Sequence, residues 1–245
     1  MKPEELILDV VQVAKKNGLG HVASSLSCVH ILQAVYRVYR EGVDRVVLSK
    51  GHGCYALYSI LAHRGQIPME WWRALGTRAS PLNGCCERHP DMGLEASTGS
   101  LGHGLPMAVG MAYALSRTDP RARVFCIVGD GELQEGSCWE ALQFAVRHAL
   151  DRLLVIVDCN HLQALCPTSE VVRGDLEAKL AAWGLRVDSV PGHNPKALDK
   201  ALAPKVEMAR PMALVASTVK GFGVPYMEGR AEWHYRALPR ANGKS

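Results

Sequence analysis

A short polar segment that directly follows an apolar run constrains this chain most. The run "RVFCIV" (123–128) is typical of a buried strand, and "GDGELQEGSCWEA" (129–141) comes immediately after it. Carboxylates beside glycines suit ligand binding there, because ligands of open parallel α/β sheets gather at the carboxyl ends of strands. The helix predicted from Ser137 onward points its N-terminal amides toward the same place. Asp130 is therefore the first candidate ligand residue.

Apolar runs of two different periodicities alternate along the whole chain. The strand-like runs are rich in Val, Ile and Leu, which indicates a parallel sheet buried on both faces. They lie at 44–53 (ending in a glycine loop), 123–128, 152–158, 185–190 and 212–218. Helical periodicity predicts helices at 3–16, 25–40, 54–65, 105–117, 137–150 and 195–210. The sequence therefore predicts an α/β fold with a mainly parallel sheet, in a single domain over residues 1–245.

Composition argues against several classes of protein. The formal net charge is +4 with 21% charged residues, and no block of like charges or basic stripe indicates nucleic acid. No apolar run approaches the roughly 20 residues of a membrane span, and the N-terminal run is amphipathic rather than signal-like. Eight cysteines without a C-x-x-C pair predict reduced thiols, and the pair Cys85–Cys86 has no assigned role. We expect a cytoplasmic protein.

A second predicted strand also ends in polar residues, at "VIVDCN". Residues 132–159, 28 in all, separate the GDG segment from Asn160 at the end of this run. Consecutive strands of such folds are often neighbours, so Asp130 and Asn160 could form the oxygen-rich site that Mg²⁺ prefers. Gly129 and Gly131 would let the backbone approach a phosphate and adopt unusual turns. The alternative is that this polar segment only caps the helix that follows it.

Several histidines lie in predicted loops. Four of them follow a glycine, namely His21, His52, His103 and His193. Loop imidazoles titrate near neutrality and can move protons in catalysis, although a surface role is the commoner alternative for any one of them. Lys50 either pairs with a phosphate or is a solvated loop lysine.

The spacing from GDG to Asn resembles the thiamine diphosphate-binding pattern, and the surrounding motifs resemble transketolase. Besides "GDGELQEGSCWEA" and "IVDCNHLQ", the similar segments are "GHVASSLSCVHIL", "DRVVLSKGHGCYALY", "HPDMGLEASTGSLGHGLPMAVGMA" and "TVKGFGVPYMEG" followed by "WHY". They occur in the family's order and cover nearly the whole chain. The resemblance implies the thiamine diphosphate-binding fold, a three-layer α/β/α arrangement with a mainly parallel sheet.

The same resemblance implies how a site would be built. It implies a divalent metal, Mg²⁺ or else Ca²⁺ or Mn²⁺, bound by Asp130, by the side chain of Asn160 and by the backbone carbonyl of Leu162. The residues implied around the cofactor are His52, Leu101, Gly102, Gly129, Asp130, Gly131, Glu132, Asn160 and His234. The implied catalytic residues are His21, His52, His89 and Glu135. Among these, Glu135 resembles the glutamate that meets a partner carboxylate across the subunit interface.

The implied activity is thiamine diphosphate-dependent ketol transfer between sugar phosphates or related sugars. In this family a glutamate of a second, pyrimidine-binding domain activates the cofactor, and this sequence contains no segment that resembles such a domain. We therefore expect the partner to be a C-terminal-type transketolase subunit in a two-plus-two heterotetramer, with neither nucleic acid nor a membrane involved. The chain would be active only together with that partner.

Some positions depart from the family pattern. Ala23 and Ser24 replace two glycines, His103 replaces a glutamine, His30 replaces a glutamate, and Leu165–Cys166 replace Asp-Gly. The first three of these departures lie near the expected substrate or cofactor pocket, and they concern the choice of sugar more than the cofactor. Two alternative enzymes are a 2-oxoacid dehydrogenase α-type subunit and a deoxyxylulose phosphate synthase-like subunit. The third alternative is a non-catalytic scaffold, and loss of the metal ligands would be its signature.

Overall fold

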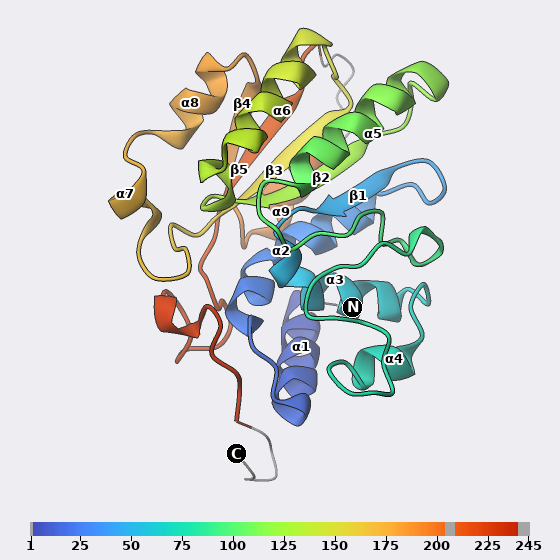
Figure 1. Ribbon diagram of the computed structural model, residues 1–245, viewed down its shortest axis with the longest axis vertical. Helices are drawn as coiled ribbons and strands as arrows, with labels where there is room; N and C mark the ends of the chain where they lie inside the picture. The colour runs from blue at the N-terminus through green and yellow to red at the C-terminus, as the bar shows by residue number, and fades with distance from the viewer. Residues whose placement is uncertain (1, 204–208, 240–245) are drawn as a thin grey trace.

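A parallel β-sheet forms the centre of the computed structural model, which describes residues 2–203 and 209–239 (Figure 1). Its five strands in the described ranges are β1 (Arg45–Leu48), β2 (Val124–Gly129), β3 (Leu153–Cys159), β4 (Arg186–Pro191) and β5 (Met212–Ser217). They lie in the order β1-β2-β3-β5-β4, and every pairing is parallel. The predicted α/β fold class and parallel sheet are confirmed.

Helices cover both faces of the sheet, as Figure 1 shows. One apolar core lies between the sheet and α1 (Pro3–Asn17), α2 (Val22–Val38), α3 (Cys54–His63) and α9 (Pro195–Leu202). The other core lies beneath α5 (Gly104–Thr118), α6 (Gly136–Arg147) and α8 (Leu176–Ala182). Within β2, Phe125 and Ile127 enter the first core, whereas Val124 and Cys126 enter the second, because successive side chains of a strand point to opposite faces. Both faces are therefore buried, which explains the nearly continuous apolar runs.

Short helical segments complete the described structure. These are α4 (Met69–Arg73), α7 (Thr168–Val171), η1 (Gly51–Gly53), η2 (Pro90–Met92), η3 (Glu132–Gln134) and η4 (Ala231–Trp233). Helices α4, α7 and α8 were not predicted, because a helix of four to seven residues shows too little periodicity in the sequence. The helix predicted over 195–210 ends at Leu202, and residues 204–208 of that prediction lie outside the described residues.

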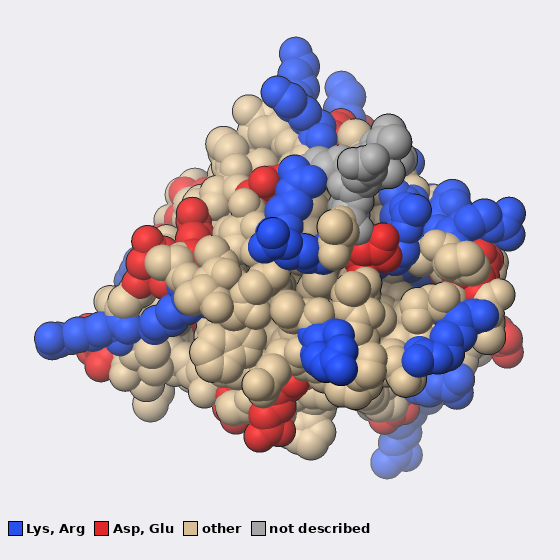
Figure 2. All heavy atoms as spheres, turned by 90° about the horizontal axis from the view of Figure 1, so that it is seen from above, with Lys and Arg blue, Asp and Glu red and all other residues tan. Residues whose placement is uncertain are grey.

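The described ranges contain no helix with the length and apolar character of a membrane span. On the face seen in Figure 2, basic side chains stand in several groups with acidic side chains and uncharged surface between them. That face therefore presents charges of both signs.

A buried ion pair ties the carboxyl edge of the sheet together. Lys50, just after β1, donates to the carboxylate of Asp158 in β3, and the two residues are 2% and 0% exposed. Asp158 also accepts hydrogen bonds from Ser27 of α2 at 2.6 Å and from Thr218, just after β5. Lys50 donates in turn to the carbonyl of Ser24 at 3.0 Å. One carboxylate thus joins β1, β3, β5 and α2, and the alternative of a solvated Lys50 is wrong.

The pKa values of this pair follow from its partners. Burial opposes the charge of Asp158, but Lys50 and the two hydroxyl donors outweigh burial and hold its pKa below the usual range. Burial likewise opposes the charge of Lys50, and the neighbouring carboxylate of Asp158 nevertheless raises its pKa. Both groups therefore stay charged inside the protein, where each is stabilised by the other.

Replacing Lys50 with Met should lower the free energy of unfolding by about 3–5 kcal/mol, because it leaves the buried Asp158 carboxylate without its cation. Urea denaturation followed by circular dichroism measures this loss. The control is Arg37→Ala, which removes an exposed ion pair to Asp199 and should cost under about 1 kcal/mol. Equal effects of the two substitutions would contradict the role given to Lys50.

Candidate active site

The predicted ligand residues follow neighbouring strands. Gly129 at the end of β2 is in register with Asp158 of β3, so Asp130 and Asn160 leave the sheet side by side. Their adjacency, predicted from chain order alone, is confirmed. The residues that follow β1 and β5 lie at this same edge, because all five described strands are parallel. The carboxyl edge therefore gathers polar residues from four separate parts of the sequence.

Asp130 is a buried carboxylate, 8% exposed, whose two oxygens are held by backbone amides. Oδ1 accepts from the N–H of Gly131 at 3.0 Å, and Oδ2 accepts from the N–H of His161 at 2.7 Å. Burial and the charge of Asp158 raise the pKa of Asp130, and the two amide donors act in the opposite direction. A cation beside this carboxylate would relieve the same cost of burial.

Asn160 is half-buried and follows β3 as Asp130 follows β2, and its Oδ1 accepts from the N–H of Leu162 at 3.1 Å. A carboxylate oxygen, an amide oxygen and a nearby backbone carbonyl are hard donors, which is the chemistry that Mg²⁺, Ca²⁺ or Mn²⁺ prefers. One strand end supplies Asp130, and the next supplies Asn160 and Leu162. The chemistry of these oxygen donors therefore fits the divalent metal expected from the sequence.

Glu132 links three parts of the site. It is 2% exposed, and its Oε1 accepts from Ser49 Oγ at 2.5 Å and from the N–H of Gly102 at 3.1 Å. Its Oε2 accepts from the N–H of Gly129 at 3.2 Å. Burial raises the pKa of Glu132, and these hydrogen bonds oppose that rise. Glu132 therefore fixes the Gly102 loop against the ends of β1 and β2.

Gly102 is a position that only glycine suits. Its φ is +78°, and an added Cβ would lie 2.5 Å from Ser137 Oγ and 2.7 Å from Glu135 Cβ. Ser137 also donates from Oγ to the carbonyl of Gly102 at 2.7 Å. The neighbouring Leu101 is 36% exposed, and Glu135 is exposed. The Gly102 loop, with Leu101, thus packs closely against the start of α6, where Glu135 lies.

The prediction that Gly129 and Gly131 adopt unusual turns is wrong. Neither has a positive φ, and Gly131 is an ordinary right-handed residue with φ −65°. An added Cβ on Gly129 would make only ordinary contacts, the nearest being Glu132 N at 3.9 Å, whereas one on Gly131 would lie 3.2 Å from Gln163 Cβ. What remains for these glycines is close approach by another molecule, not an unusual turn.

Three of the predicted histidines form one cluster. The ring centroids of His21, His52 and His234 are separated by 5.4 Å (His21–His52), 5.3 Å (His21–His234) and 5.3 Å (His52–His234). The Tyr235 ring meets His21 edge-on at 4.7 Å. His21 begins α2 in the left-handed conformation, and its buried Nδ1 has no hydrogen-bond partner among the described residues. The cluster therefore offers at least one unused polar atom to another molecule.

The histidine cluster is kept neutral by its surroundings. Burial lowers the pKa of all three histidines, and the charge of Lys220 adds to the effect on each. The charge of Lys50 adds to it for His52 and His234, and the pKa of His234 falls to about 3. Lys220 Nζ lies 2.6 Å from Nδ1 of His234 and is 2% exposed. Burial and the charge of Lys50 also lower the pKa of Lys220, to about 8. Because Lys220 donates to Nδ1, the proton of neutral His234 is assigned to Nε2.

His89 lies apart from this cluster. It is exposed and lines a second pocket of about 680 Å³ together with Cys85, Cys86 and His103. Cys86 is buried and Cys85 half-buried, and both are free thiols. The structure therefore brings together His21, His52 and His234 but not His89.

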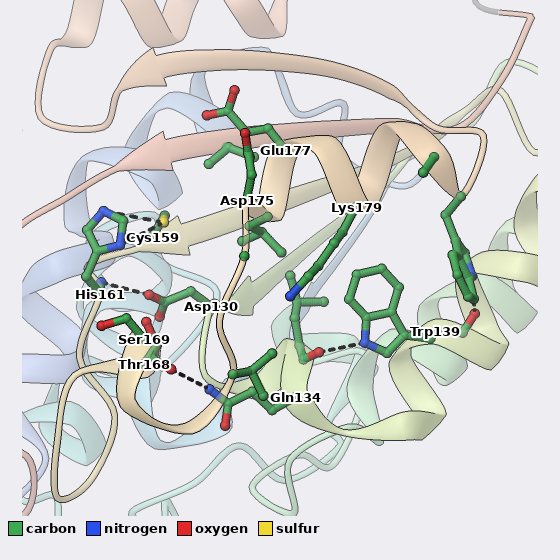
Figure 3. Close-up of a pocket in the computed structure, with 17 residues that line it drawn as sticks. Asp130, Gln134, Trp139, Cys159, His161, Thr168, Ser169, Asp175, Glu177 and Lys179 are labelled. Atoms are coloured by element: carbon green, nitrogen blue, oxygen red, sulfur yellow. Dashed lines mark hydrogen bonds between the residues drawn. The ribbon is translucent and has the colours of Figure 1, made fainter.

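Sequence reasoning missed several residues of the site. Lys220 and Asp158 were not singled out, although both stand in motifs that were, "TVKGFG" and "IVDCN". Two side chains of softer chemistry, Cys159 and His161, were also missed. They lie close to Asp130 at one end of a pocket of about 700 Å³, which Figure 3 shows between the strand ends and α8. The pattern "DCNH" was their only signal.

Comparison with known proteins identifies relatives along nearly the whole chain. Residues 5–244 match the family described as "Transketolase, thiamine diphosphate binding domain". One subunit of the apulose-4-phosphate transketolase of Actinobacillus succinogenes is 36% identical over 237 residues, which is 93% of this chain and 86% of the relative. One subunit of the 6-deoxy-6-sulfo-D-fructose transketolase of a Clostridium species is 37% identical over 91% of this chain and 85% of the relative.

Solved structures agree with the sequence relatives. The transketolase of Campylobacter jejuni superposes with a TM-score of 0.86 at 26% identity, covering 96% of this chain and 40% of that chain. The transketolase of Leishmania mexicana superposes with a TM-score of 0.80 at 28% identity, covering 96% of this chain and 39% of that chain. This chain thus spans about two fifths of the solved transketolases that it matches.

The neutral histidine cluster should make stability depend on pH. The folded-state pKa of His234 is about 3, below the roughly 6.5 of an unfolded histidine, so the unfolded state binds more protons between these values. Its contribution to stability is present above pH of about 6.5 and is lost as the pH falls toward 3. Urea denaturation at pH 7.5 and pH 5 should show a smaller loss for His234→Asn than for the wild type. His89→Asn, an exposed site outside the cluster, should keep the wild-type loss, and identical profiles for all three proteins would contradict the burial argument.

Proposed function

The chain belongs to the transketolase family, and from this premise we propose that it is the diphosphate- and metal-binding subunit of a two-chain transketolase. The proposed reaction is thiamine diphosphate-dependent transfer of a two-carbon ketol unit between sugar phosphates or related sugars. The observation that carries it is the convergence of Asp130, Asn160 and a neutral histidine cluster on one edge of the sheet. Residues 1–245 would form one diphosphate-binding domain.

The metal would be held by Asp130, by Asn160 Oδ1 and by the carbonyl of Leu162. Mg²⁺ is the preferred ion, with Ca²⁺ or Mn²⁺ as substitutes, because each of these ions accepts hard oxygen ligands. The raised pKa of the buried Asp130 supports this assignment, since a cation would stabilise its charged form. The positive charge of Lys220 at the same edge would stabilise a diphosphate there.

The cofactor's diphosphate would lie against Gly129, Gly131 and the histidines His52 and His234, and its aminopyrimidine against Leu101 and Gly102. When bound, thiamine diphosphate supplies the nucleophilic carbon that carries the ketol unit. Gly129 leaves the more open space for close approach, since an added Cβ there would meet nothing nearer than Glu132 N at 3.9 Å. The part proposed for Glu132 is to hold the Gly102 loop in place, through the three hydrogen bonds that it accepts.

Proton transfer on the sugar oxygens would fall to His21 and His52. Burial lowers the pKa of both, so each has a free lone pair at neutral pH and can accept a proton as a general base. The unpartnered Nδ1 of His21 supports a contact with substrate. His89 is the remaining histidine that we propose to be catalytic, and it lines the second pocket.

The partner would be a C-terminal-type transketolase subunit that carries the pyrimidine-binding domain, in a two-plus-two heterotetramer. Two relatives of nearly this length are named as subunits, and the chain spans about two fifths of the solved transketolases. Leu101, beside Gly102, and Glu135, just before α6, are both exposed and suit such an interface. Glu135 would meet a carboxylate of the partner across this interface.

The substrates would be sugar phosphates or related sugars, as the printed names of the relatives suggest. The family match favours ketol transfer over a 2-oxoacid dehydrogenase or a deoxyxylulose phosphate synthase. The presence of Asp130 and Asn160 at adjoining strand ends argues against a scaffold. Cysteines such as Cys126 and Cys138, packed in the apolar core as free thiols, support a reducing compartment, and we assign the enzyme to the cytoplasm.

Replacing Asp130 with Ala should weaken Mg²⁺-dependent binding of thiamine diphosphate by at least about 100-fold, because the metal loses its only side-chain carboxylate. Isothermal titration calorimetry of the complex with the partner subunit measures the affinity. The control is Asp175→Asn, which removes a carboxylate elsewhere in the 700 Å³ pocket but keeps an N-cap side chain for α8. An unchanged affinity of the Asp130→Ala complex for thiamine diphosphate would contradict the assignment of Asp130 as a metal ligand.

The purified single chain should show no ketol transfer, and addition of a C-terminal-type subunit should restore it. The reason is that the proposed activating glutamate belongs to the partner. A coupled assay with a ketose phosphate donor and an aldose phosphate acceptor measures the rate, and size-exclusion chromatography reports the assembly. Full activity of the chain alone would refute the two-chain proposal.

A further inference from the structure

Asp130, one of the proposed magnesium ligands, lies close to two side chains that are softer metal ligands. Asp130, Cys159 and His161 each offer a ligand atom, and these atoms all lie within 4.8 Å of one another. The Sγ of Cys159 is 3.8 Å from Nδ1 and 3.9 Å from Nε2 of His161. Figure 3 shows the three residues together at one end of the 700 Å³ pocket.

The strand end explains why these side chains meet. Asp158 and Cys159 are successive residues of β3 and point to opposite faces, so Asp158 enters the ion pair with Lys50 while Cys159 faces the pocket. Two residues later, His161 adopts a left-handed conformation with φ 60°, which is uncommon for a residue other than glycine. Its N–H donates to Asp130 Oδ2 at 2.7 Å, and this bond holds the turn against the carboxylate.

We propose that Asp130, Cys159 and His161 form a second divalent-cation site, suited to Zn²⁺ or Co²⁺ rather than Mg²⁺. Thiolate, imidazole and carboxylate are the ligands that Zn²⁺ takes, whereas Mg²⁺ prefers oxygen alone. Three protein ligands would leave a fourth position open for water or another small ligand. Binding releases the thiol proton of Cys159 to solvent.

The surroundings favour a cation. Asp175, Glu177 and Lys179 line the same pocket, which gives two acidic groups and one basic group there besides Asp130. The ammonium of Lys179 is engaged with the carbonyl of Arg173 at 2.8 Å. The ligand atoms need to approach one another by about an ångström to reach zinc distances, and the exposed His161 ring has room to do so. The site needs no cofactor and does not rest on the proposed function, although Asp130 would serve both metals.

The test is a titration of the chain with Co²⁺ under reducing conditions, without thiamine diphosphate. A thiolate bound to Co²⁺ gives a charge-transfer absorption band, and we expect one Co²⁺ per chain, displaced by Zn²⁺. Cys159→Ala should abolish the band. His161→Asn, which tolerates the left-handed backbone, should weaken Co²⁺ binding by more than the roughly 10–100-fold typical of losing an outer-shell partner.

Two further variants separate this proposal from its alternatives. Asn160→Ala removes a proposed magnesium ligand and should keep the Co²⁺ band, so failure of the magnesium proposal is distinguishable from failure of this one. A double Cys85→Ser and Cys86→Ser variant removes the thiols of the second pocket and should also keep the band. Absence of any band in the wild type would overturn the proposal, as would a band that survives in Cys159→Ala. If Cys159→Ala does not fold, unchanged Co²⁺ affinity in His161→Asn overturns it instead.

Discussion

The buried ion pair between Lys50 and Asp158 is the interaction on which the carboxyl edge depends. Lys50 follows β1, and its ammonium reaches past the end of β2 to a carboxylate in β3. The same carboxylate accepts from Ser27 and Thr218, so a helix and a third strand end share it. Charges this deep are stable only when paired and hydrogen-bonded, which makes the relative position of these four segments nearly fixed.

That fixed edge allows the site to hold further charges and neutral histidines close together. Lys50 and Lys220 oppose the carboxylates of Asp158 and Asp130, so the lysine and aspartate charges at this edge balance. The lysines and burial keep the adjoining histidine cluster unprotonated. An anion that carries a metal would fit such an edge, because the metal would meet Asp130 while the anion would meet Lys220.

Much of this architecture could be predicted from the sequence, because strand runs and their order are local signals. The adjacency of Asp130 and Asn160 followed from two consecutive strands, and the register confirms it. Long-range contacts were not accessible: Lys50 and Asp158 are 108 residues apart, and no periodicity says that they pair. Chain order likewise could not reveal that His89 lies outside the histidine cluster, or that Gly102 rather than Gly129 has the backbone that requires glycine.

The most direct test of the central claim is a crystal structure of the chain with its partner subunit, grown with thiamine diphosphate and Mn²⁺. The account predicts an anomalous peak from Mn²⁺ between Asp130 and Asn160, with the diphosphate oxygens completing its coordination. A diphosphate bound elsewhere, or a Mn²⁺ peak away from these two strand ends, would contradict it.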